Sequence, residues 1–203
     1  MKTFSRIQEV TYRRPPRGYT MRGEAVPIAL LPGKTVFMTL RSETHVDWLA
    51  DAILAFDWSG KADEDKPVMP ADRDAYDERR FSEIRISRRP NVIWQRDGNG
   101  GKIPPSSLGP PMLVYFDDIA DPHTVRQVKP GEFDRYFGKG FDLVSIKVVG
   151  TDEDVNLTIL NVLPWIATLQ GDLERERTFG KPLSEIPPEQ LLTASAFILD
   201  QKP

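Results

Sequence analysis

The chain has 203 residues, 39% of them hydrophobic and 28% charged, a balance that is typical of a folded globular protein and excludes a disordered or fibrous one. Its 27 Lys and Arg nearly balance its 30 Asp and Glu, and because a net charge of -3 does not attract phosphate backbones, no nucleic-acid partner is expected. The absence of cysteine excludes disulfides, zinc-thiolate sites and cysteine nucleophiles.

The first predicted elements are two strands joined in a hairpin. Apolar and polar residues alternate over 22–30 and again over 36–40, which is the period of a strand. Pro32 and Gly33 lie between them in the second and third positions of a type II turn, where proline fixes φ and glycine accepts a positive φ. Pro27 removes a backbone donor from the first strand and predicts an edge or bulged position.

A helix is predicted to begin at Thr44, which can cap its first turn, with Asp47 as the capping-box partner. Residues 57–72 and 95–110 are polar or rich in proline and glycine, and they are predicted to be loop regions. Between them, the stretch ADRDAYDERRFSEIRI favours a second helix by composition. The apolar face of the first helix carries Val46, Leu49, Ile53 and Phe56.

Further along the chain, the pattern predicts three more strands and a short helix. The apolar run at 112–116 lies between prolines and aspartates and predicts a buried strand, and 124–128 predicts another short one. Aromatic residues share one side of a helix over 133–137, which Gly138 can end. Alternation over 144–148 predicts the last strand.

Two helices are expected in the C-terminal part, at 155–166 and at 189–199, and residues 168–203 are predicted to form a helical extension. Strands and helices are mixed without a regular βαβ repeat. We therefore expect a single α+β domain over residues 1–203, with a mostly antiparallel sheet and a few packed helices. The apolar positions of the first of these helices are Leu157, Leu160 and Leu163.

The string DDIAD at 117–121 invites comparison with the D-D-x-x-D motif of isoprenoid synthases. That motif holds magnesium because a helix places its first and last aspartates one turn apart on the same face. Here a predicted strand precedes the string, Pro122 follows it, and the expected fold is not all-helical. We therefore reject the isoprenoid-synthase interpretation.

Two interpretations of this loop stay open. In the preferred one, the aspartates form a structural turn and their side chains bond neighbouring backbone N–H groups. In the alternative, the loop holds a divalent cation, as part of a cation-binding module or a metal-dependent hydrolase. No other cofactor is predicted, and because no complete catalytic constellation is recognisable, the chain is predicted to be non-enzymatic. The candidate cation ligands are Asp117, Asp118, Asp121 and His123.

Arginines supply the other candidate site. Arg13, Arg14 and Arg17 lie among prolines and tyrosines and are candidates for binding an anion or an acidic protein partner. A second arginine group at 79–89 is interleaved with acidic residues, which predicts a solvated, ion-paired helix face. Trp165, between apolar neighbours, is predicted to pack in the core rather than to bind a ligand.

Several short motifs follow one another in the second half of the chain. Their pattern is F-x-D, then D-P-x-S/T-V-x-x-V-x-P, then F-G-x-G-V-x-L, and finally L-P-W-L. This chain departs from the pattern at two positions, where Phe141 stands for the valine and Ile166 for the last leucine. They are carried by Phe116, Asp118, Asp121, Pro122, Thr124, Val125, Val128, Pro130, Phe137, Gly138, Gly140, Leu143, Leu163, Pro164 and Trp165.

From Arg22 onward, these motifs, with RGEAVPI and LRSE in the early hairpin, resemble a family of uncharacterised proteins from Gram-negative bacteria, many of them predicted lipoproteins. The family has no established activity. The resemblance therefore implies a fold and a place in the cell envelope, with an unknown protein as partner, but it implies no mechanism. It also favours the structural turn at 117–121.

The location of the protein depends on where its chain begins. No run of eighteen or more apolar residues occurs, so no transmembrane segment is predicted in the chain as written. The charged N-terminus is not followed by the shorter apolar region of a signal peptide, so no signal peptide is predicted in it either. The lipoprotein signal and a first strand that the resemblance implies before Ser5 are missing. We expect an envelope protein whose start lies upstream of Met1, or a shortened cytoplasmic form that begins at Met1.

Overall fold

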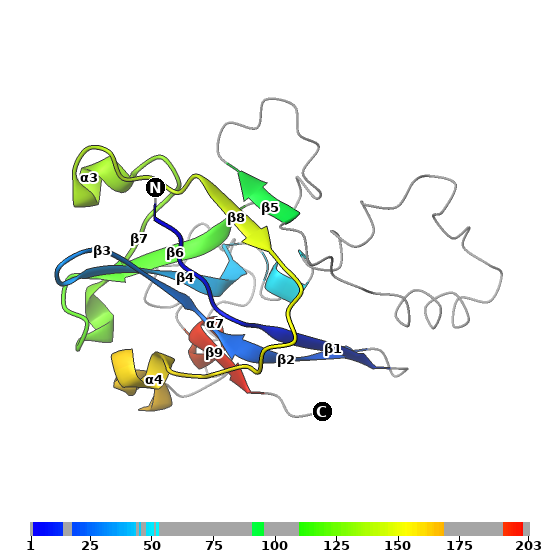
Figure 1. Ribbon diagram of the computed structural model, residues 1–203. Coiled ribbons are helices and arrows are strands. Elements are labelled where there is room, and N and C mark those ends of the chain that lie inside the picture. Colours follow the sequence, from blue (N-terminus) through cyan, green and yellow to red (C-terminus); the bar gives the residue numbers. More distant parts are fainter. Residues whose placement is uncertain are drawn as a thin grey trace, which may run out of the picture.

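The predicted α+β class is confirmed. In the computed structural model (Figure 1), the antiparallel strands of the described residues form three small sheets, and the described helices are short and lie around them. The predicted loop regions, the second helix, Arg14 and Arg17 lie outside the described residues, apart from Gln95 and Pro110 at the margins of one loop. The structure describes residues 2–13, 18–43, 45, 48–50, 52, 91–95, 110–168 and 193–200.

The central sheet has four strands in the order β3-β4-β6-β7. The predicted hairpin is confirmed as β3 and β4, and Gly33 at its turn has a φ of 72°. Pro27 lies on the edge strand β3, as predicted, and the register of β3 shifts between Ala29 and Leu31. The bounds of the four strands are β3 Val26–Leu31, β4 Lys34–Ser42, β6 Pro111–Phe116 and β7 Val125–Gln127.

Two smaller sheets flank the central one. One has the order β1-β2-β9, with β1 (Glu9–Arg13), β2 (Gly18–Glu24) and β9 (Ile198–Asp200). The other pairs β5 (Asn91–Gln95) with β8 (Ser145–Val148).

The single strand predicted over 22–30 was wrong, because the chain leaves β2 at Glu24 and enters β3 at Val26, in a different sheet. Ala25, between the two strands, is fully buried, and its N–H donates to the carbonyl of Phe197. The alternation of apolar and polar residues continues through this crossing, and so it gives no signal of the change of sheet.

The predicted helix at 133–137 is confirmed as α3 (Phe133–Phe137), which ends at Gly138 with a φ of 87°. Residues 48–50 and 52, from the helix predicted at Thr44, are helical. The helix predicted over 155–166 is present but shorter, since only α4 (Ile159–Val162) is α-helical and Pro164 begins the 3-10 helix η3 (Pro164–Thr168). At the C-terminal end, α7 (Ala194–Phe197) passes into β9 rather than continuing as a helix.

The core lies on both faces of the central sheet. Every residue of β6 is buried, as expected for the apolar run, and alternate side chains point to opposite faces. One face, with Phe37 and Val114, packs against α4, η3 and α7. The other face, with Val36 and Tyr115, packs against α3.

Candidate functional site

We call residues 117–124, between β6 and β7, the acidic loop. Its aspartates bond to the loop itself: Asp118 Oδ1 accepts from Ala120 N at 2.9 Å, and Asp121 Oδ1 accepts from His123 N at 2.9 Å. The hydroxyl of Thr124 lies 2.9 Å from the carbonyl oxygen of Asp118 and 2.8 Å from that of Asp121. This is the bonding expected of the structural turn, in which aspartate oxygens satisfy nearby backbone donors.

Asp117 takes a different partner. Its Oδ2 lies 2.6 Å from Nε of Arg126 on β7, and this hydrogen bond holds the pKa of the Asp117 carboxyl below its ordinary value. Any stability that the pair contributes is therefore present above the unfolded-state pKa of Asp117 and is lost as the pH falls through its folded-state pKa. Burial, helped by the nearby Asp117, raises the pKa of the Tyr115 phenol.

The candidate ligands do not converge on one point. Asp117, Asp118, Asp121 and His123 are all described, and within the described part of the chain no group of three or more His, Asp and Glu is arranged to hold a metal ion. Among the candidate arginines, Arg13 ends β1, while the other two lie outside the described residues. The predicted arginine site therefore stays a prediction.

Trp165, in η3, anchors the acidic loop. Its indole Nε1 donates to the carbonyl of Ile119 at 2.8 Å, and its ring stands edge-on to the rings of Phe116 and Phe197. The ring packs against the core, as predicted, and the same side chain fixes the top of the loop. Residues that lie 46 positions apart in the sequence thus build one local structure.

Exposed apolar side chains occur at this end of the central sheet. Because Val36 pairs with Tyr115, the tip of the β3–β4 hairpin and the acidic loop lie at the same end of the sheet, and Trp165 connects that end to η3, which follows α4 (Figure 1). We call this region the apolar end. Its exposed large apolar residues are Leu31, Ile119, Leu160 and Val162, each between 37% and 41% exposed.

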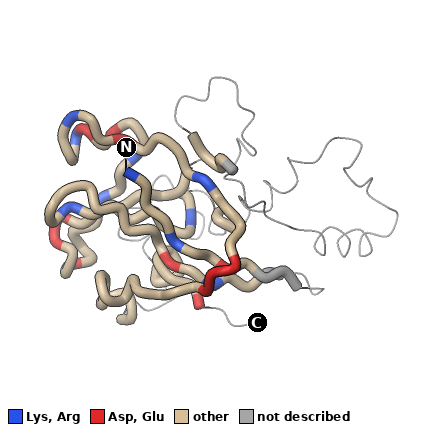
Figure 2. The backbone as a smooth tube through the Cα atoms, in the orientation of Figure 1, with Lys and Arg blue, Asp and Glu red and all other residues tan. Residues whose placement is uncertain are grey.

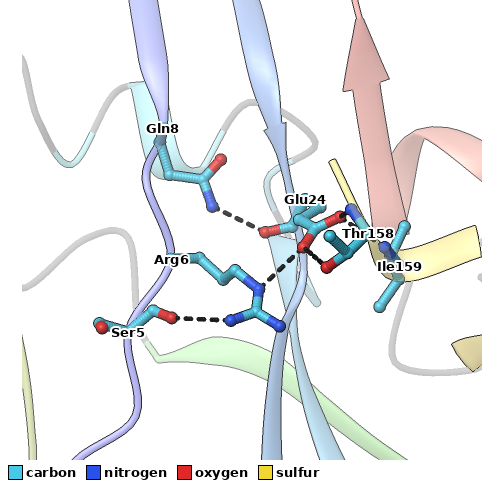
Figure 3. Close-up of polar contacts among 6 residues, drawn as sticks. All are labelled: Ser5, Arg6, Gln8, Glu24, Thr158 and Ile159. Carbon is cyan, nitrogen blue, oxygen red and sulfur yellow. Dashed lines mark hydrogen bonds and ion pairs between the residues drawn. The ribbon is translucent and has the colours of Figure 1, made fainter. Parts of the chain in front are cut away.

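A second polar site, which the sequence did not reveal, is built around Glu24 at the end of β2 (Figure 3). Its carboxylate is fully buried. Oε1 accepts from Arg6 Nε at 2.8 Å and from the Thr158 hydroxyl at 2.9 Å, and Oε2 accepts from the backbone N–H of Thr158 and, at 2.6 Å, of Ile159. These donors compensate for the loss of hydration that a buried charge suffers. We call this group the Glu24 cluster.

Gln8 completes the Glu24 cluster. Its Nε2 donates to the backbone carbonyl of Glu24 at 2.7 Å, and its side chain lies directly over Gly23. A Cβ atom on Gly23 would come within 1.5 Å of Gln8 Oε1, so the close approach requires glycine. Glycine inside a strand was the one available signal for this contact. The partners themselves are 18 and 134 residues from Glu24, too distant for any local pattern.

Comparisons of the chain with protein-family models, curated proteins and solved structures found no match. Among the described residues, no helix is both long enough and apolar enough to cross a membrane. The acidic loop, the apolar end and the Glu24 cluster are therefore the basis on which a function is proposed.

Proposed function

We propose that the chain is a non-enzymatic domain of the bacterial cell envelope that works through contact with another protein. The observation that supports it is the acidic loop, in which the side chains of Asp118 and Asp121 bond within the loop while Ile119, at its top, is 41% exposed. A loop built in this way presents an apolar side chain in a fixed position. The envelope location rests on the family resemblance alone.

The segment beside the acidic loop has the composition of a contact surface. Residues 155–168, which include α4 and η3, contain no charged residue, and Figure 2 shows this part of the tube free of both charge colours. The centres of protein interfaces are depleted in charge and enriched in apolar side chains. Because Trp165 and Thr124 already hold the loop in place, the loop would lose little conformational entropy when a partner binds it.

A photoreactive phenylalanine analogue at position 119 tests this proposal. Expressed in cells of the source organism, the variant should form one protein adduct of defined mass on irradiation, and the adduct should fractionate with the cell envelope. Leu160→Asp should reduce the adduct severalfold, because a charge in the centre of an apolar contact is unfavourable.

The matched control places the same analogue at Val144, which is 51% exposed and precedes β8, a strand of a different sheet from β6 and β7. It should give no adduct of that mass. The same adduct from both positions, or none from position 119, would contradict a specific contact at the apolar end. An adduct found only in the cytoplasmic fraction would contradict the envelope location and leave the contact standing.

The alternative function, a cation-binding module or metal-dependent hydrolase, has less support from this geometry and has a test of its own. A cation that binds the folded state raises its Tm by mass action. Because asparagine Oδ1 can still accept the two turn bonds, Asp118→Asn combined with Asp121→Asn removes the charges without removing the turn.

We expect millimolar calcium, magnesium or manganese to leave the Tm of the unaltered chain unchanged. A rise in Tm that the double variant abolishes would establish the cation site and overturn the structural interpretation of the loop.

A further inference from the structure

The geometry points to a conformational latch at the N-terminal end of the described chain. Residues 2–8 have no regular secondary structure and run ahead of β1, and we call them the strap. The strap is releasable, and its release loosens the start of α4. Glu24 is the residue through which the two segments are connected (Figure 3).

Within the described part of the chain, the strap is anchored at Glu24. None of the strap residues is fully buried, and its side chains bond to the strand beneath through Arg6, which contacts the carboxylate of Glu24, and Gln8, which contacts its carbonyl. The side chain of Arg6 is 33% exposed, whereas that of Glu24 is fully buried. A segment with little burial and few anchoring contacts opens at low free energy, so the strap can detach without unfolding the sheets.

The start of α4 depends on the same carboxylate. Oε2 of Glu24 accepts from Thr158 N and Ile159 N, at the first turn of α4, and the hydroxyl of Thr158 donates to Glu24 as well. The helix has four residues, and a helix of that length is not stable by itself. Its position is therefore fixed by Glu24 and by the burial of Ile159 and Leu163.

Two arrangements follow from these contacts. With the strap in place, the charge of Glu24 is paired with Arg6 and its second oxygen holds α4. With the strap released, the carboxylate would lose the guanidinium of Arg6, and keeping the charge buried in its present position would be unfavourable. Glu24 then turns towards the space that the strap has left, and the N–H groups of Thr158 and Ile159 lose their acceptor.

The latch gives the proposed contact surface a means of control. α4 carries Leu160 and Val162, two of the four exposed residues of the apolar end. A factor that draws the strap away would therefore change the surface offered to a partner. This last step rests on the proposed function, whereas the coupling of the strap to α4 does not.

Amide hydrogen exchange in Arg6→Ala tests the coupling. Because hydrogen bonds to a charged acceptor are among the strong ones in a protein, the amides of Thr158, Ile159 and Leu163 should exchange at least about tenfold faster in this variant. The amide of Val128, which donates to Leu113 within the central sheet region, should keep its rate. Unchanged exchange at Thr158 and Ile159, or an equal increase at every amide, would overturn the latch.

Gly23→Ala releases the strap without changing any charge. The new Cβ would take the place of Gln8 Oε1, so the flexible end of Gln8 must leave and its bond to the carbonyl of Glu24 is lost. The same three amides should exchange faster than in the unaltered chain. If neither this variant nor Arg6→Ala accelerates them, the strap does not control α4.

Arg135→Ala is the matched control for charge. Arg135 stacks on the ring of Tyr136 in α3, and its removal changes the net charge by the same amount as Arg6→Ala. Exchange at Thr158 and Ile159 should be unaffected by it. If Arg135→Ala accelerated exchange at Thr158 and Ile159 as much as Arg6→Ala does, the acceleration would be due to the change in net charge, and the latch would be overturned. Because exchange is measured on the isolated chain, failure of the adduct at position 119 would leave this result intact.

Discussion

Glu24→Gln is expected to lower the free energy of unfolding by about 2 kcal/mol or more, because a hydrogen bond to a charged group contributes about 1.5–3 kcal/mol and the N–H groups of Thr158 and Ile159 would lose their charged acceptor. Glutamine is nearly the same size, so the loss is electrostatic. Its amide nitrogen can only donate, yet it would face the donors of Arg6, Thr158 or Ile159. Urea denaturation, with the midpoint compared at constant m value, measures the change.

Glu9→Gln is the control for this experiment. Glu9 is an exposed carboxylate that lies 3.5 Å from the guanidinium of Arg22, and exposed pairs contribute little. Its substitution should change the free energy of unfolding by less than about 0.5 kcal/mol. Equal effects of the two substitutions would show that the burial of Glu24 carries no special stabilisation.

Phe197→Ala is expected to cost about 3–5 kcal/mol of stability, the usual range for removing a buried aromatic ring. Phe197 is fully buried at the end of α7, and its ring lies 6.3 Å from those of Phe37 and Phe116 and 5.8 Å from that of Trp165, between centroids. The cavity that alanine leaves would not be filled by collapse of a rigid sheet. Denaturant unfolding measures the loss.

Val149→Ala provides the comparison, since Val149 is 46% exposed and has little packing to lose. A change within about 0.5 kcal/mol is expected there. Should Phe197→Ala cost no more than that, the segment 193–200 would not be part of the folded core.

Local signals predicted those parts of the fold that are determined by neighbouring residues. The hairpin followed from Pro32 and Gly33 between two alternating segments, and α3 was placed correctly because Gly138 can end a helix with a positive φ. The buried strand β6 followed from its unbroken apolar run. In each case, the residues that specify the element lie within it or next to it.

Tertiary contacts decided the element bounds that were predicted wrongly. Residues 155–158 have an amphipathic pattern, but Thr158 and Ile159 give their N–H groups to Glu24, and the α-helix begins only at Ile159. The C-terminal helix stops at Phe197 because the next residues pair with β2. Neither partner is close in sequence, so no window of neighbouring residues contains the information.

The candidate sites divide in the same way. The turn bonds of Asp118 and Asp121 were expected from the sequence, because aspartate bonds to backbone groups two residues ahead. The anchoring of the loop by Trp165 and the whole Glu24 cluster were not expected, because they join segments that only the fold brings together.

The passage from β2 to β3 through Ala25 has a mechanical consequence. Because a single residue separates the two strands, tension applied along this segment would pass from the flanking sheet to the central one through an almost inextensible covalent link. The connection cannot extend, so a force that acts on one sheet also acts on the other before either one unfolds. Under force, the two sheets should therefore yield as one mechanical unit, and the buried bond from Ala25 to Phe197 would bear the first shear.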